Sequence, residues 1–432
     1  MRYFTLKTRL LALSLLAAIC AAAQPTPAEF AAHPERSAGI YRSYEYLPGP
    51  AAPVPAGYEP FYISHYGRHG SRYHSSEKAY DRPLGVLLQA SEAGKLTPKG
   101  QEVLAKVEAL AADAYLRYGD LSPRGTAEHR GIAERMYAAW PEVFSTDGGR
   151  VCRVESRSTL VPRCILSMAA FNERLKELNP AITTTRDASG RYLDYMARGN
   201  SLVLARKAVA AVADSLSRAR LNPDRLVRSL VTDPRTVAEP LELMQDLYML
   251  ASIVQDVSHL GIEPFYDIFT DEELYSLWEC ENALRYMQMG PSARFGDPIV
   301  ADAGALLRNI VETADEVVRG ESDLSASLRF GHDTCITPLL ALLGVEGAST
   351  RVESLDDVAA VWNAQTVMPM GTNIQFVFFR NPATGDVRVR VLHNERDARL
   401  PIPGGPYYPW KELKKHCESL YFTSDFPAPE VD

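Results

Sequence analysis

A short stretch near the start of the chain places arginine and histidine between two glycines. Residues 67–72 read Gly-Arg-His-Gly-Ser-Arg and follow an apolar and aromatic run at residues 61–66. Arginine presents a planar set of donors that fits phosphate or carboxylate oxygens. Histidine can act as a nucleophile, an acid or a base near neutral pH, and the glycines let the backbone turn sharply and approach a ligand closely. The stretch therefore predicts an anion site with a histidine, His69, inside it.

A second histidine follows another predicted strand much later in the chain. The strand pattern at residues 325–330 leads into Gly331-His332-Asp333-Thr334, and an apolar helix is expected at once, over residues 336–343. Open α/β sheets place their ligands at the carboxyl ends of strands, so the two histidine loops are expected to meet at one edge of a sheet. There, Asp333 can protonate a leaving alkoxide and later activate water.

A third basic residue is expected at the start of a helix in between. Pro162 suits the first turn of a helix, and Arg163, Ser167 and Phe171 share one face of it because they are four residues apart. Arginine at a helix N-terminus suggests an anion contact. We therefore expect Arg68, Arg72, Arg163 and His332 to surround a phosphate group, and the arginines to keep His69 neutral, so that it can attack phosphorus.

Each of these residues also has a plainer interpretation. A single histidine or arginine in a loop is more often a surface or hydrogen-bonding residue than a catalyst. His65 alternates with apolar strand positions and is interpreted as a core histidine. A metal site made of His65, His69 and His74 is an alternative, but their spacing fits no helix face, and we expect neither a metal nor another cofactor.

Composition limits the classes of function. The 432-residue chain has a net charge of −8, which disfavours a nucleic-acid binder. Its 36 arginines greatly exceed its 10 lysines, which reflects either genomic base composition or a substrate rich in oxyanions. Five cysteines lie beyond residue 24 with no CxxC pair, so a structural zinc site is not expected and at least one thiol stays free.

The first 23 residues resemble an export signal. Positive residues at 2, 7 and 9 precede an apolar run at 10–19, and alanines at 21–23 offer a cleavage site. The apolar run is too short to cross a bilayer. The sequence thus predicts a periplasmic or secreted protein that has no membrane contact once its signal is removed.

The predicted elements divide the mature chain into an α/β domain and a helical insert. Strand and helix patterns occupy residues 24–179 and 299–432, whereas residues 180–298 are mostly helical and are expected to form a cap. Within the cap, residues 186–235 carry ten Arg or Lys against five Asp, and residues 236–282 carry eleven acidic residues and no Arg or Lys. Such runs are usually solvated helix faces; the alternative is that some of the arginines face a substrate.

The order of these motifs resembles the histidine phosphatase superfamily, in its acid phosphatase and phytase branch. Residues 68–72 match its RHGxR signature, His332-Asp333 its HD pair, Arg163 its third phosphate-binding arginine, and residues 121–125 its LTxxG turn. The resemblance implies a phosphohistidine on His69, a proton donor in Asp333, and phosphate contacts from Arg68, Arg72, Arg163 and His332. It also implies a phosphoglycerate mutase-like α/β sandwich around a mainly parallel sheet, with a helical cap and no metal.

The chain departs from the family's pattern at two places. His74 stands where the family usually has proline, and Thr334 follows an HD pair although inositol polyphosphate phosphatases usually carry His-Ala-Glu. The lead-in at residues 65–67 and the chain length look most like bacterial multiple inositol polyphosphate phosphatases. The expected function is an exported phosphomonoesterase that hydrolyses phytate, other inositol polyphosphates or related organic phosphates through a phosphohistidine. The alternatives are a general acid phosphatase for sugar phosphates and nucleotides, a phosphate- or polyanion-binding protein with little turnover, and a metal-dependent hydrolase.

Overall fold

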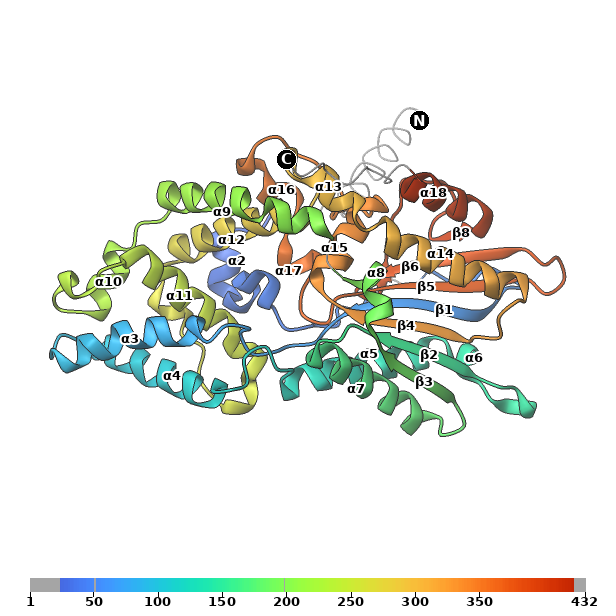
Figure 1. Ribbon diagram of the computed structural model, residues 1–432, viewed down its shortest axis with the longest axis horizontal. Coiled ribbons are helices and arrows are strands. Elements are labelled where there is room, and N and C mark those ends of the chain that lie inside the picture. The colour runs from blue at the N-terminus through green and yellow to red at the C-terminus, as the bar shows by residue number, and fades with distance from the viewer. Residues whose placement is uncertain (1–23, 50–51, 198, 423–432) are drawn as a thin grey trace, which may run out of the picture.

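The computed structural model describes residues 24–49, 52–197 and 199–422. The expected export signal at residues 1–23 lies outside these ranges. In the described part of the chain, no helix combines the length and the apolar character that a membrane crossing requires. All five described cysteines are buried free thiols. Figure 1 shows a sheet covered by helices at one end of the molecule and a group of helices at the other.

One mixed sheet of eight strands organises the molecule. Its order is β3-β2-β4-β1-β5-β6-β7, with β8 paired to β6. The first four strands in that order run parallel, while β5 and β6 pair antiparallel. The strands are β1 (Glu59–Arg68), β2 (Arg153–Ser158), β3 (Thr183–Ala188), β4 (Ala326–Gly331), β5 (Asn373–Arg380), β6 (Val387–His393), β7 (Arg396–Asp397) and β8 (Tyr407–Pro409). The expected α/β fold is confirmed, and the parallel strands form only the half of the sheet that carries the site.

Helices cover both faces of the sheet, as Figure 1 shows. Two separate apolar clusters result, because the sheet buries side chains on both faces. One face packs against α5 (Pro123–Ala139), α6 (Pro141–Phe144) and α7 (Pro162–Leu178). The other packs against α14 (Gly304–Arg319), α15 (Asp333–Leu342) and α18 (Trp410–Phe422).

The second part of the molecule is helical and has its own core, in which Trp278 is fully buried. Its helices are α2 (Pro27–Ala32), α3 (Lys78–Glu92), α4 (Pro98–Ala114), α9 (Asn200–Arg220), α10 (Asp224–Leu230), α11 (Pro240–Ile253) and α12 (Asp271–Met289). The shorter helices α8 (Leu193–Met196), α13 (Gly296–Ala301), α16 (Val358–Val361) and α17 (Ala364–Val367) lie between this group and the sheet.

The expected division at residues 180 and 298 differs from this packing in two ways. β3 lies beyond residue 179 but pairs with β2 at the edge of the sheet. α3 and α4 come before residue 180 but pack in the helical core. The sequence pattern does not predict β3, because its side chains lie at the edge of the sheet and are mostly exposed and polar. They show no alternation of apolar and polar residues. The helical group is therefore assembled from three stretches of chain, residues 27–32, 78–114 and 200–289.

Candidate active site

The site forms where β1 and β4 end side by side. They are parallel neighbours, and Arg68, the last residue of β1, lies opposite Gly331, the last residue of β4. His69 and His332 consequently emerge together, and their ring centroids are 5.6 Å apart. The backbone N–H of His69 donates to the carbonyl of Gly331 at 2.9 Å. Gly67 still belongs to β1, so the turn begins after Arg68, later than the sequence suggested.

The third arginine reaches the same place from the next strand. β2 pairs with β4 and ends at Ser158, a few residues before α7 begins at Pro162. Arg163 is therefore in the first turn of α7, beside His69, whose pKa its charge lowers. Further along the same face, the Ser167 hydroxyl accepts the backbone N–H of Gly70 at 3.2 Å. The helix face expected from the four-residue spacing does contact the histidine loop.

Arg68 is the most rigidly held of the three arginines. Its guanidinium is fully buried, and Nη1 donates to the carbonyls of Ile40 and Met368 at 2.8 and 2.7 Å. Nη2 forms an ion pair with Oδ2 of Asp333 at 2.9 Å. A charge with this little freedom provides a preorganised contact for a ligand oxygen.

All three arginines keep donors that the protein does not use. In the described part of the chain, the buried Nε atoms of Arg68, Arg72 and Arg163 have no hydrogen-bond partner. Buried donors without partners are costly in a folded protein. The three arginines lie close enough to His69 for their charges to lower its pKa, so together they can neutralise the oxygens of a phosphate group.

The geometry fixes which nitrogen of His69 can react. Nδ1 lies 2.9 Å from the carbonyl oxygen of Gly70, which can only accept, so Nδ1 carries the proton and Nε2 keeps its lone pair. Burial lowers the pKa of His69 well below its usual range, and the charges of Arg68, Arg163 and Arg72 lower it further. The ring is therefore neutral and can attack an electrophile through Nε2.

Asp333 and His332 occupy the start of α15. His332 is its N-cap and Asp333 its first residue, where the helix dipole favours negative charge. Burial alone would raise the pKa of Asp333, but the charges of Arg68, His332 and Arg72 outweigh it and lower that pKa to about 2. For His332, burial and Arg163 lower the pKa to about 4. All six residues expected from the sequence thus meet in one place.

Two further residues at this site were not identified from the sequence. Arg285 of α12 is a fourth cation whose charge lowers the pKa of Asp333; its Nε donates to Glu281 Oε1 at 2.6 Å. Tyr41 lies under Arg72, with the guanidinium carbon 5.5 Å from its ring centroid. No motif surrounds either residue, and only tertiary packing brings them to the histidines.

His74, which replaces the family's usual proline, is part of the packing of the loop. Its ring lies 4.7 Å from that of Tyr41, between centroids, and its Nε2 is 3.3 Å from the carbonyl oxygen of Met249. The loop is also closed by the N–H of Gly119, which donates to the carbonyl of His74 at 2.8 Å. The backbone beyond Arg72 is thus held without proline.

His65 is a core residue, as expected. It is 1 % exposed and packs against Phe171 and Phe330, with ring centroids 5.4 Å away in both cases. Burial lowers its pKa to about 3, so the ring is neutral. Among the described residues, no three His, Cys, Asp or Glu side chains are arranged to hold a metal ion.

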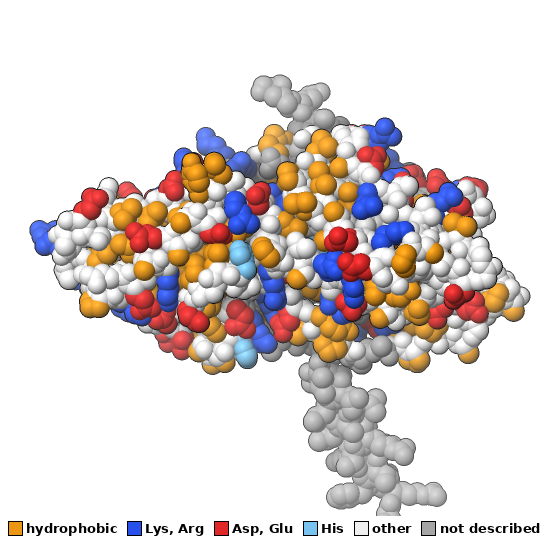
Figure 2. Space-filling view, turned by 90° about the horizontal axis from the view of Figure 1, so that it is seen from below, with side chains coloured by type: hydrophobic (Ala, Val, Ile, Leu, Met, Phe, Trp, Pro, Cys, Tyr) orange, Lys and Arg blue, Asp and Glu red, His pale blue; other side chains and the backbone are white. Residues whose placement is uncertain are grey.

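Four of the ten basic residues at 186–235 form ion pairs with acids, Arg218 with Asp214 among them. Arg225 forms an ion pair with Glu273, Arg220 with Asp356, and Arg235 with Asp233. These pairs agree with the interpretation of the charge run as a solvated surface. Figure 2 shows that the Lys, Arg and His side chains near the middle of one face of the molecule lie among Asp and Glu side chains.

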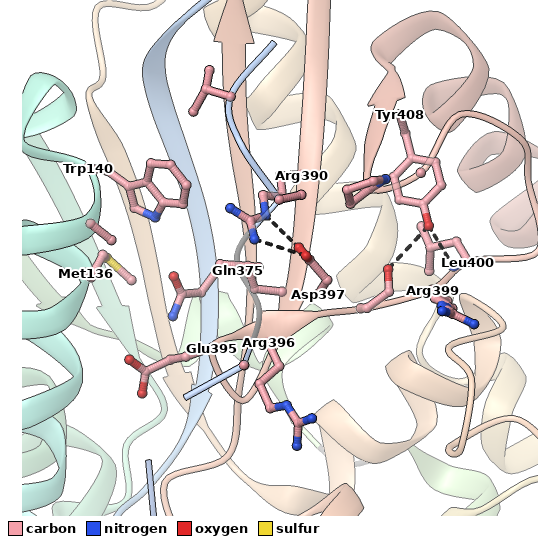
Figure 3. A pocket seen from close by; sticks show the side chains of 18 of the residues that line it. Met136, Trp140, Gln375, Arg390, Glu395, Arg396, Asp397, Arg399, Leu400 and Tyr408 are labelled. Carbon is pink, nitrogen blue, oxygen red and sulfur yellow. Dashed lines mark hydrogen bonds and ion pairs between the residues drawn. The ribbon is translucent and has the colours of Figure 1, made fainter. Parts of the chain in front are cut away.

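A cavity of about 940 Å³ lies elsewhere, between Trp140 and strands β6 and β7. Figure 3 shows that two of its charged groups bind each other, because Arg390 donates to Asp397. Arg135 likewise donates to Glu395 at 2.8 Å. None of the six predicted site residues lines it.

Two glycines bring the histidine loop against α5, which yields a testable prediction. A Cβ on Gly70 would lie 2.5 Å from the carbonyl oxygen of Gly125, too close for any real contact. We expect Gly70→Ala to destabilise the fold by about 1–3 kcal/mol and to lower activity, because the loop must move. Thermal melting and steady-state kinetics measure both effects. Gly85→Ala is the control, since a Cβ there meets nothing within 4 Å; equal effects of the two variants would contradict this account.

Comparisons with known proteins agree with the fold. Residues 67–394 match the family described as histidine phosphatase superfamily (branch 2). The structure is similar to that of a Bifidobacterium longum multiple inositol polyphosphate phosphatase in complex with inositol hexasulfate, with a TM-score of 0.70 and 19% identity, covering 88% of this chain and 97% of that chain. It is also similar to the phytase from D. castellii, with a TM-score of 0.64 and 16% identity, covering 90% and 86%. No curated protein matches the chain by sequence.

Proposed function

The chain belongs to branch 2 of the histidine phosphatase superfamily, and from this premise we propose that it is a phosphomonoesterase that works through a phosphohistidine on His69. The observation that carries the proposal is the neutral, buried His69 among three arginines, with Asp333 at 2.9 Å from one of them. A phosphate monoester needs such a cluster, because its charge must be neutralised before a nucleophile can approach phosphorus.

The proposed reaction has two steps. The unused donors of Arg68, Arg72 and Arg163 bind the phosphoryl oxygens, and Nε2 of His69 attacks phosphorus while Asp333 protonates the leaving alkoxide. Asp333, now deprotonated, then activates a water molecule that hydrolyses the phosphohistidine.

We propose inositol polyphosphates, phytate among them, as the substrate class. Two considerations support this choice: the likeness in fold to a phosphatase solved with inositol hexasulfate, and Arg285, which brings a guanidinium, paired with Glu281, from the helical part to Asp333. Residues 1–23 are expected to direct the protein out of the cytoplasm. There the enzyme would meet free phytate and other organic phosphates.

Phosphate release from inositol hexakisphosphate, a sugar phosphate, a nucleotide and p-nitrophenyl phosphate tests the proposal. We expect turnover of every ester whose phosphate group can reach His69, with the highest kcat/KM for the inositol polyphosphate. Activity should be complete in the presence of a chelator. Tight phosphate binding without turnover would instead select a binding protein, and loss of activity with EDTA would select a metal-dependent hydrolase.

The pH dependence of kcat gives a second test of the role of Asp333. Its pKa of about 2 in the free protein is set by the arginines around it. A bound phosphate dianion neutralises these charges and raises that pKa. The proton is present below the pKa of the complex and is lost above it, so we expect kcat for an alkyl phosphate to fall as pH rises from the acidic range. A kcat that rises steadily toward alkaline pH would contradict the assignment.

A further inference from the structure

Behind the histidine loop, two buried carboxyl groups converge on one serine. Ser71 lies between Gly70 and Arg72, and its Oγ is 2.7 Å from Glu128 Oε1 and 2.6 Å from Asp256 Oδ1. Asp256 is fully buried and Glu128 is 7 % exposed. Glu128 belongs to α5 beside the sheet, whereas Asp256 belongs to η5 (Val254–Leu260), which continues α11 of the helical part. Neither residue takes part in the proposed reaction.

The contacts in this cluster require one more proton than the hydroxyl groups supply. Ser43 adds a third short contact, with its Oγ 2.8 Å from Asp256 Oδ1. The two hydroxyl oxygens also lie 3.2 Å from each other. Even without that longer contact, the three short contacts to carboxyl oxygens need three protons, and the hydroxyls of Ser43 and Ser71 provide two. The third must sit on a carboxyl group, so the two acids together carry one negative charge.

The neighbours of each acid show which one holds the proton. The backbone N–H groups of Tyr44 and Ser71 donate to the two oxygens of Glu128, at 2.8 and 2.7 Å. Asp256 receives no backbone N–H, and among the described residues its Oδ2 has no partner. The charge is therefore better stabilised on Glu128 and the proton on Asp256.

The electrostatic surroundings agree with this assignment. Burial raises the pKa of Asp256 well above its usual range, and the charge of Glu128 raises it further. The other titratable or charged groups that interact with Asp256 are Arg68, Arg72, Tyr80 and Tyr266. Arg124 faces Glu128, with 3.7 Å between its Nε and Oε1, which again favours charge on Glu128.

We propose that neutral Asp256 and charged Glu128 act as a pair of positioning residues that hold Ser71, and through it Arg72 and His69, at the phosphate site. The inference rests on the proposed phosphatase function for its effect on turnover. It also assigns a purpose to the contact between the two parts of the molecule, because Asp256 donates its proton from the helical part to the loop that ends β1.

The pair predicts opposite responses to two isosteric substitutions. In Asp256→Asn, the amide nitrogen can donate to Ser71 Oγ as the acid does, so we expect kcat/KM within about threefold of the wild type. In Glu128→Gln, the amide nitrogen must face a backbone N–H, since both oxygens of Glu128 accept one. We expect kcat to fall about tenfold or more, with a lowered melting temperature. Asp246→Asn, another buried acid in the helical part, which pairs with Arg82, is the control and should leave kcat unchanged.

An infrared difference spectrum between the wild type and Asp256→Asn tests directly whether Asp256 carries the proton. We expect the C=O stretch of a protonated carboxylic acid in the wild type at neutral pH, and its loss in Asp256→Asn. This readout needs neither turnover nor a folded Glu128→Gln variant, so it separates failure of this inference from failure of the phosphatase proposal. Absence of the band from the wild type, or its persistence in Asp256→Asn, would overturn the assignment. Equal tolerance of both substitutions in kcat would overturn the positioning role.

Discussion

Replacing His69 by alanine is expected to abolish phosphate release, by about 10⁴-fold or more in kcat. The variant removes the imidazole whose Nε2 is the proposed nucleophile. It leaves the arginines in place, and Arg68 in particular is fixed by two backbone carbonyls and Asp333. Binding of inorganic phosphate, measured by thermal shift or calorimetry, should therefore survive while turnover is lost.

The matched control is a histidine on the same strand. His65 is buried among phenylalanines and its ring nitrogens have no partner among the described residues. Leucine is similar in size to histidine, so His65→Leu removes an imidazole from β1 and leaves the residues of the site in place. Turnover should therefore persist. If His69→Ala retained wild-type kcat, or if both variants lost activity equally, the nucleophile assignment would be wrong.

Asp333→Asn is expected to slow cleavage of an alkyl phosphate by about 10²-fold or more, with a smaller effect on phosphate binding. Asparagine keeps the shape of the side chain but cannot give up a proton to an alkoxide. The nitrophenolate of p-nitrophenyl phosphate leaves without protonation, so for this ester the first step should be nearly normal. Hydrolysis of the phosphohistidine then becomes limiting, because the base that activates water is missing.

Burst kinetics separate these two effects. The variant should release one equivalent of nitrophenol per enzyme quickly and then turn over slowly. Similar losses for alkyl and nitrophenyl esters, with no burst, would contradict the role of Asp333 as proton donor.

Much of the site could be predicted from the sequence because its residues directly follow strands or begin a helix. A strand that ends at Arg68, just before His69, and another that ends before His332-Asp333 are visible as apolar runs, and parallel strands bring their carboxyl ends to one edge. Arg163 could be predicted for the same reason, as it begins the helix after a third strand. These residues need only the right strand order to meet.

The parts that could not be predicted depend on contacts between distant segments. β3 is an exposed edge strand with no apolar alternation, and α3 and α4 join the helical core although they come before most of it in the chain. Arg285 and the Asp256–Glu128 pair reach the site only through the packing of α12, η5 and α5. A buried acid looks like any surface acid in a sequence until its neighbours are known.

The most direct test of the central claim is detection of the phosphorylated enzyme. Asp333→Asn, mixed rapidly with p-nitrophenyl phosphate and quenched, should contain close to one acid-labile phosphate per chain, on the peptide that carries His69. The same experiment with His69→Ala should give none. Phosphate on another residue, or turnover of the nitrophenyl ester with no phosphorylated enzyme at any time, would contradict the account.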